Sequence, residues 1–182
     1  MTNWRPAKAD MYEDVHTRWQ YAHVNTEAPE EERLKLLWRA SRDSARTPVQ
    51  WSDAPNAGFT EAEKPWFYVN DNYREVNVAA LEQDPDSLLN FYREAIRLRK
   101  RLPCVRHGHY REYDTQCETR YVYSRQWQGQ KLLVVCAFSD QPQPFAPPEG
   151  FDLKAATLAL SSHKGTDPET LLPYESRVYL WE

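Results

Sequence analysis

Residues 132–138, Leu-Leu-Val-Val-Cys-Ala-Phe, form the segment that most constrains the fold of this 182-residue chain. The run is apolar at odd and even positions alike, and the side chains of a strand alternate between the two faces of a sheet. A strand that is apolar on both faces belongs in the interior of a sheet. We therefore predict a central, buried strand over this run.

Four further strands are predicted around it, over residues 107–113, 120–127, 153–160 and 177–181, from their period and composition. Gln128, Gly129 and Gln130 form the expected turn between the strand at 120–127 and the central one. The proline-rich residues 142–150 read as a connection without regular structure.

The residues before 103 carry the period of amphipathic helices. One helix is predicted over residues 10–24, and a second opens at Pro29, because proline and the glutamates that follow it suit a first turn. A third starts with Asp84 as N-cap and Pro85 at the first helical position, and Pro103 ends it. Its apolar face comprises Leu88, Leu89, Tyr92, Ala95, Ile96 and Leu102.

Two groups of charged or titratable side chains have competing interpretations. The basic run at 97–101 suits a phosphate site or the last turn of a helix, where cations complement the helix dipole, and we favour the helix end. His107 and His109 lie two apart on a predicted strand, as metal ligands sometimes do, but no third ligand is obvious nearby. We expect surface histidines there, with no metal and no cofactor.

Residues 41–51, Ser-Arg-Asp-Ser-Ala-Arg-Thr-Pro-Val-Gln-Trp, are here called the arginine loop, and Asn-Ala-Gly-Phe follows at 56–59. Proline and the Asn-Ala-Gly step disfavour regular secondary structure across much of this stretch. A guanidinium is a rigid fork of donors that suits carboxylates or adjacent sugar hydroxyls. From composition alone, a surface loop with an Arg–Asp pair is the favoured interpretation of the arginine loop.

Residues 42–51 resemble the string Arg-Asp-Asn-Ala-Arg-Thr-Pro-Met-Gln-Trp, which follows the eighth barrel strand of oligo-1,6-glucosidases in glycoside hydrolase family 13, the α-amylase family. Only Ser44 and Val49 depart from it. Residues 69–78, Val-Asn-Asp-Asn-Tyr-Arg-Glu-Val-Asn-Val, are similar to a second family string, and residues 84–100, 132–139 and 173–179 resemble later family segments. Residues 1–3 match the end of the eighth strand.

The resemblance implies an α+β fragment: the helical end of a (β/α)8 TIM barrel over residues 1–103, then an antiparallel β-sandwich domain over 104–182. A complete barrel needs about 250 residues. Because the likeness begins after the eighth strand, we expect the C-terminal piece of a longer α-glucosidase that acts on short α-linked gluco-oligosaccharides.

The resemblance also implies one substrate-binding residue, Arg46, which contacts hydroxyls of the terminal glucose in the family. We expect Asp43 to orient Arg42 or Arg46, and Arg42 to serve loop structure alone. Retaining hydrolysis needs two carboxyl groups about 5–5.5 Å apart, and the family motifs that supply them do not occur here. No catalytic residue is therefore assigned, and the chain alone is expected to be inactive.

The bulk composition limits the classes of partner that the chain is expected to bind. Apolar residues make up 41% and charged residues 27%, and the formal charge of −4 argues against a nucleic-acid or anionic-membrane surface. The N-terminus lacks the apolar core of a signal peptide, and Cys104, Cys117 and Cys136 suggest neither disulfides nor a zinc site, so we expect a cytoplasmic protein. The alternative function is an independent β-sandwich module for carbohydrate binding or subunit contact.

Overall fold

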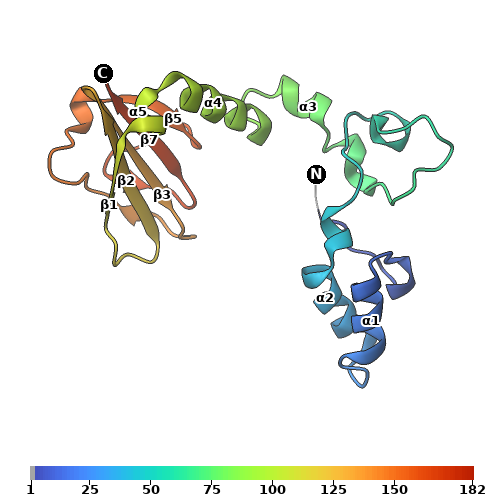
Figure 1. The fold of residues 1–182 in the computed structure, drawn as a ribbon. Coiled ribbons are helices and arrows are strands. Elements are labelled where there is room, and N and C mark those ends of the chain that lie inside the picture. The colour runs from blue at the N-terminus through green and yellow to red at the C-terminus, as the bar shows by residue number, and fades with distance from the viewer. Residues whose placement is uncertain (1–2) are drawn as a thin grey trace. The chain divides into compact units, whose positions relative to one another are not determined.

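The computed structural model describes residues 3–182, which divide into two compact units at the boundary between Leu89 and Asn90. Figure 1 shows the ribbon of both units. The first is built from helices and irregular segments, and the second contains the sheet, so the chain is α+β. The family match of residues 1 and 2 lies outside the described residues.

The first unit contains α1 (Val15–His23), α2 (Glu30–Ala40) and α3 (Val78–Gln83). The prediction of a helix over 10–24 is wrong at its start, because Asp14 caps α1 and Ala9–Met11 form a separate 3₁₀ turn, η1. The second predicted helix is present, but it begins at Glu30 with Pro29 as its N-cap, one residue later than predicted. Between α2 and α3 lie only the 3₁₀ turns η2 (Arg42–Ala45), η3 (Pro55–Gly58) and η4 (Asp71–Arg74), which confirms the irregular stretch.

The third predicted helix begins later than expected. Helix α4 spans Leu88–Arg101, and Asp84 is the C-cap of α3, so Pro85 lies in the turn between two helices. Pro103 does not only end α4; it opens a short further helix, α5 (Pro103–His107). His107 therefore ends a helix while His109 begins a strand, and the predicted same-strand pair is wrong. The His107 ring lies 5.7 Å from that of Trp127.

The second unit is organised by a five-stranded sheet with the order β1-β2-β3-β7-β5, in which all neighbours are antiparallel. Its strands are β1 (His109–Tyr113), β2 (Arg120–Trp127), β3 (Gln130–Ala137), β5 (Thr157–Ser161) and β7 (Ser176–Trp181). The central position and burial of β3 confirm the prediction for residues 132–137, but Phe138 lies after the strand and is 62% exposed, so the prediction is wrong at its last residue.

The connections in this unit refine the predictions. Gln128 and Gly129 form the turn between β2 and β3, both with positive φ (47° and 87°), a conformation that glycine adopts without strain. The strand predicted at 153–160 starts only at Thr157, because Leu153–Ala155 form a 3₁₀ turn, η5. Within the proline-rich connection, β4 (Gln143–Pro144) pairs with β6 (Thr170–Leu171) in a small second sheet.

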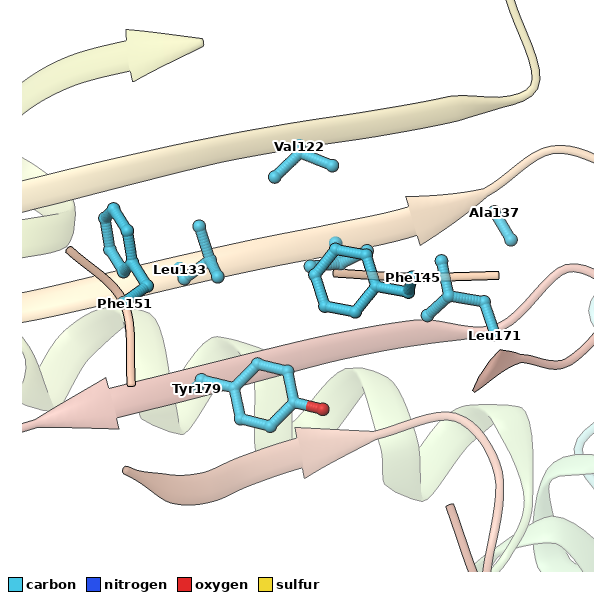
Figure 2. Packing of buried hydrophobic residues seen from close by; sticks show 8 residues of the cluster. Val122, Leu133, Ala137, Phe145, Phe151, Leu171 and Tyr179 are labelled. Carbon is cyan, nitrogen blue, oxygen red and sulfur yellow. The ribbon is translucent and has the colours of Figure 1, made fainter. Parts of the chain in front are cut away.

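Both faces of the main sheet are covered. Figure 2 shows one face, where Val122, Leu133 and Tyr179 of the sheet pack with side chains from the connecting segments, namely Phe145, Phe151 and Leu171. On the other face, Leu132, Val134 and Leu180 pack with Leu102 and Cys104, and Leu98 of α4 and Val105 of α5 pack against that cluster. One face is thus closed by loops and the small sheet, and the other by helices.

Candidate functional site

The arginine loop is shaped by its own backbone and by Ser41. The Ser41 hydroxyl accepts a hydrogen bond from the Asp43 N–H at 3.2 Å and so caps η2. The Arg46 N–H donates to the Asp43 carbonyl at 3.1 Å, which closes the turn, and the Trp4 N–H donates to the Ser44 carbonyl at 2.8 Å. The backbone that carries Arg46 is therefore fixed at both ends of η2.

Asp43 anchors this turn to the segment before α1. Its side chain is 2% exposed, and its Oδ2 accepts the backbone N–H groups of Glu13 and Asp14, each at 2.7 Å. The prediction that Asp43 orients Arg42 or Arg46 is wrong, because its carboxylate is used by backbone donors. A buried carboxylate satisfied in this way is not available to a substrate.

Arg42 pairs with Asp14, the N-cap of α1. The Asp14 carboxylate also accepts the Thr17 N–H at 3.2 Å and the Thr17 hydroxyl at 2.8 Å. Burial alone would raise the pKa of the Asp14 carboxyl, but the hydrogen bonds from Arg42 and Thr17 outweigh it and lower that pKa. Arg42 thus has a structural partner, in line with its predicted role in the loop.

Arg46 differs from Arg42 in having no such partner. Its side chain is exposed, and no hydrogen bond or ion pair to its guanidinium is formed within residues 3–182. The five N–H donors of the fork are therefore free for a ligand, while the backbone beneath them is held in place. This is the arrangement that recognition of adjacent hydroxyls or a carboxylate requires.

The C-terminal half of the arginine loop is fixed by Gln50. This side chain is 1% exposed and its Nε2 donates to Asn72 Oδ1 at 3.1 Å and to the Val76 carbonyl. The Gln50 carbonyl in turn accepts the Val78 N–H at 2.8 Å. These hydrogen bonds join the arginine loop to residues 72–78, which lie more than twenty residues further along the sequence.

A tight turn follows at 56–58. Asn56, Ala57 and Gly58 all have positive φ, at 53°, 58° and 65°, and the Ala57 carbonyl accepts both the Trp51 and Ser52 N–H groups. A Cβ at Gly58 would lie 2.5 Å from the Ser52 hydroxyl, so a larger residue there would clash as well as strain the backbone. The Trp51 ring is left 52% exposed and presents an apolar face near the end of the arginine loop.

Sequence reasoning missed an aromatic groove in the first unit. It has a volume of about 420 Å³ and is lined by Trp4, Met11, Glu13, Asn56 and residues 64–69. The Trp4 ring stacks on Tyr68 with centroids 4.9 Å apart, and Trp66 is 90% exposed. Burial, together with the nearby Asp71 carboxylate, raises the pKa of Tyr68 to about 12. The run Trp66-Phe67-Tyr68 was the available signal.

The described residues show no metal-binding group and no membrane helix. Within residues 3–182, no three His, Cys, Asp or Glu side chains are grouped to hold a metal ion. Over the same residues, no helix is long and apolar enough to cross a bilayer.

The chain that contains the arginine loop can be assigned to a protein family. The model of the α-amylase catalytic domain matches residues 3–108, more than half of the chain. The chain therefore belongs to the α-amylase family, glycoside hydrolase family 13.

Individual relatives show which members of the family the chain is similar to. The oligo-1,6-glucosidase of Halalkalibacterium halodurans is 36% identical over 99% of this chain and 33% of that relative. The trehalose-6-phosphate hydrolase structure of Bacillus licheniformis matches with a TM-score of 0.89 at 33% identity, over 99% of this chain and 34% of that one. The structure of the trehalulose synthase MutB of Pseudomonas mesoacidophila MX-45 matches with a TM-score of 0.85 at 35% identity, over 99% of this chain and 33% of that one. The chain spans about a third of the length of the relatives it matches.

Proposed function

We propose that this chain is the C-terminal portion of an α-glucosidase that acts on short α-glucosides such as isomalto- or malto-oligosaccharides. In this proposal residues 1–103 complete the catalytic barrel and residues 104–182 form the β-domain that follows it in the sequence. The relatives named above, which include an oligo-1,6-glucosidase, support the substrate class. We also propose a cytoplasmic location, because the number and spacing of the three cysteines in the sequence suggest neither a disulfide framework nor a zinc site.

The contribution of this chain to catalysis is Arg46. The observation that carries the proposal is that its guanidinium is exposed and unpaired while Asp43 and Ser41 hold the turn beneath it. A fork of donors held in this way would position the terminal sugar and place positive charge beside the catalytic carboxylates. Those carboxylates would come from the rest of the enzyme, so the chain alone is expected to release no glucose from maltose or isomaltose.

The test is a chimera that joins this chain to the part of the Halalkalibacterium oligo-1,6-glucosidase that it does not match. In the active chimera, Arg46→Ala is expected to lose about 2–4 kcal/mol of transition-state stabilisation in kcat/KM, as for loss of a charge-assisted donor in a closed site. Arg46→Lys should recover little, because one ammonium group cannot reproduce the fork.

Arg42→Ala is the matched control, since Arg42 lies in the same loop but pairs with Asp14. It should leave kcat/KM within a few-fold of the unmutated chimera. If Arg42→Ala abolished turnover while Arg46→Ala left it intact, the substrate-binding role would belong to the other arginine.

A further inference from the structure

The second unit contains a groove that the proposed role of Arg46 does not use. The groove, here called the loop groove, has a volume of about 860 Å³. It lies over the sheet face shown in Figure 2, because Phe145 and Phe151 of that apolar cluster line it, whereas α4 and α5 pack on the opposite face. Small-molecule sites have volumes of about 300–1,000 Å³. The loop groove is therefore large enough for a short oligosaccharide, and it belongs to a different unit from the arginine loop.

The walls of the loop groove are held in place by hydrogen bonds of the second unit itself. Arg120 of β2 binds the Asp114 carboxylate through Nε and Nη2, at 2.9 and 2.7 Å, and its Nη1 donates to the Pro144 carbonyl at 2.8 Å. The Phe145 N–H donates to the Glu169 carbonyl at 2.8 Å, next to the pairing of β4 with β6. A groove formed in advance costs little conformational entropy when a ligand binds.

The loop groove combines apolar walls with a free donor and a free acceptor. Its apolar lining includes Pro144, Ala146, Pro147, Leu153 and Pro168. The side chains of Lys154 and Glu169 also line it and are exposed, and neither forms a hydrogen bond or ion pair through its charged group within the part of the chain that the structure describes. An ammonium group only donates hydrogen bonds, and a carboxylate only accepts them.

These features together fit a neutral ligand that carries hydroxyl groups. A hydroxyl both donates and accepts, so a sugar can bond to Lys154 and to Glu169 while its C–H groups cover the apolar walls. A wholly apolar ligand would desolvate both charges without giving them a partner. A ligand with a net charge would meet a like charge at one of the two groups.

We propose that the loop groove is a second binding site of this chain, and that it takes short α-linked gluco-oligosaccharides. The assignment to neutral sugars comes from the chemistry of the groove, and the α-gluco linkage class rests on the proposed function. The site binds the ligand without a bond-breaking step, because Lys154 and Glu169 only hold hydroxyl groups.

The experiment titrates the ¹⁵N-labelled chain with maltotriose and, separately, with isomaltotriose, and follows the amide signals by NMR. We expect saturable shifts of the Phe145, Phe151, Lys154 and Glu169 amides with at least one of the two sugars. Lys154→Ala with Glu169→Ala should weaken this binding at least about fivefold, because both hydrogen-bonding groups are lost. Both side chains are exposed, so the variant keeps the core of the second unit.

Lys100→Ala with Asp140→Ala is the matched control, because it removes one exposed cation and one exposed carboxylate that do not line the loop groove. It should bind both sugars as the unmutated chain does. The proposal is overturned if neither sugar shifts the groove amides saturably, or if the groove variant binds as well as the control variant. Equal shifts with glycerol at the same concentration would also overturn it, because the groove would then not recognise a sugar.

The outcome is independent of the test of the proposed function. Binding in the loop groove needs no turnover and no chimera, and Arg46→Ala should leave the shifts of the groove amides unchanged. An active chimera in which Arg46 matters, with no sugar bound in the groove, would overturn this inference alone. Saturable binding in the groove together with a chimera that is indifferent to Arg46→Ala would count against the proposed role of Arg46 alone.

Discussion

In the first unit the buried side chains that hold the chain together are largely polar, whereas in the second they are largely apolar. Asp43 and Gln50 are almost fully buried and bind backbone groups of distant segments. In the second unit, apolar clusters cover both faces of the sheet. Hydrogen bonds fix geometry but contribute only about 0.5–1.5 kcal/mol each, while apolar burial supplies most of the free energy of folding. The first unit is thus held mainly by directional polar contacts, and the second mainly by apolar burial.

The largest expected effect of this difference is in amide hydrogen exchange of the chain alone. Amides of β3 should exchange at least about a thousandfold more slowly than those of α1, α2 and α4, because β3 lies between two apolar clusters and short helices with exposed faces are marginal in water. Exchange followed by mass spectrometry or NMR measures this directly. Strong protection across both units would contradict the comparison and favour the independent β-sandwich module.

A second prediction concerns the one fully buried ion pair of the second unit's core. Arg177 donates to both Glu175 carboxylate oxygens, at 2.7 and 2.6 Å, and to the carbonyls of Asp167 and Thr170 at 2.7 and 2.5 Å. Neither side chain of the pair is exposed. Arg177→Met should lower the free energy of unfolding of this unit by about 3–5 kcal/mol, because it leaves the Glu175 charge buried and unpaired.

Urea unfolding, followed by a spectroscopic signal from the second unit, measures that loss of unfolding free energy. The double variant Arg177→Met with Glu175→Gln is the control, and it should be less destabilised than the single variant, since no uncompensated charge remains. Equal losses in the two variants would mean that the hydrogen bonds of Arg177, and not the buried charge, carry the stabilisation.

Sequence patterns predicted the second unit better than the first, and for a physical reason. The alternation of side chains between the two faces of a strand is a local signal, and so is the run at 132–138, which is apolar at odd and even positions alike. The position of β3 followed from these signals. The roles of Asp43 and Glu175 did not, because their partners are backbone groups or a residue inside a strand, and neither has a periodic signature. The start of α4 was predicted too early, at Pro85, because α3 lies directly before α4 and Pro85 belongs to the turn between the two helices. The substrate-binding role proposed for Arg46 comes from family resemblance alone.

Asp43 gives a prediction of intermediate size for the first unit. Asp43→Ala removes the acceptor of the Glu13 and Asp14 N–H groups, and an unsatisfied buried donor costs about 1–3 kcal/mol. The amides of residues 13 and 14 should therefore exchange faster, while those of β3 do not change. Asp53→Ala, which removes an exposed carboxylate shortly after the arginine loop, is the control and should have no effect at either place. Unchanged protection of residues 13 and 14 would mean that the anchor is dispensable.

The smallest expected effect is a pH dependence at the start of α1. The pKa of Asp14 is lowered in the folded chain, where hydrogen bonds from Arg42 and Thr17 outweigh the opposing effect of burial. A carboxyl group with a lowered folded pKa stabilises the fold above its unfolded pKa of about 3.9, and that stabilisation is lost as the pH falls through the folded value. Loosening of this cap, followed by the NMR signal of the Thr17 amide, should therefore have its midpoint below pH about 4.

Arg42→Ala should move that midpoint to higher pH, because one of the donors that lower the pKa of Asp14 is gone. The shift should be modest, since Arg42 is 58% exposed and a pair so open to solvent contributes no more than about 1 kcal/mol. Thr17→Val, which removes the hydroxyl donor and keeps the backbone N–H, should act in the same direction. A midpoint that neither variant moves would show that the backbone N–H of Thr17 alone fixes the ionisation of Asp14, and the polar network would then hold the first unit through fewer contacts than its geometry indicates.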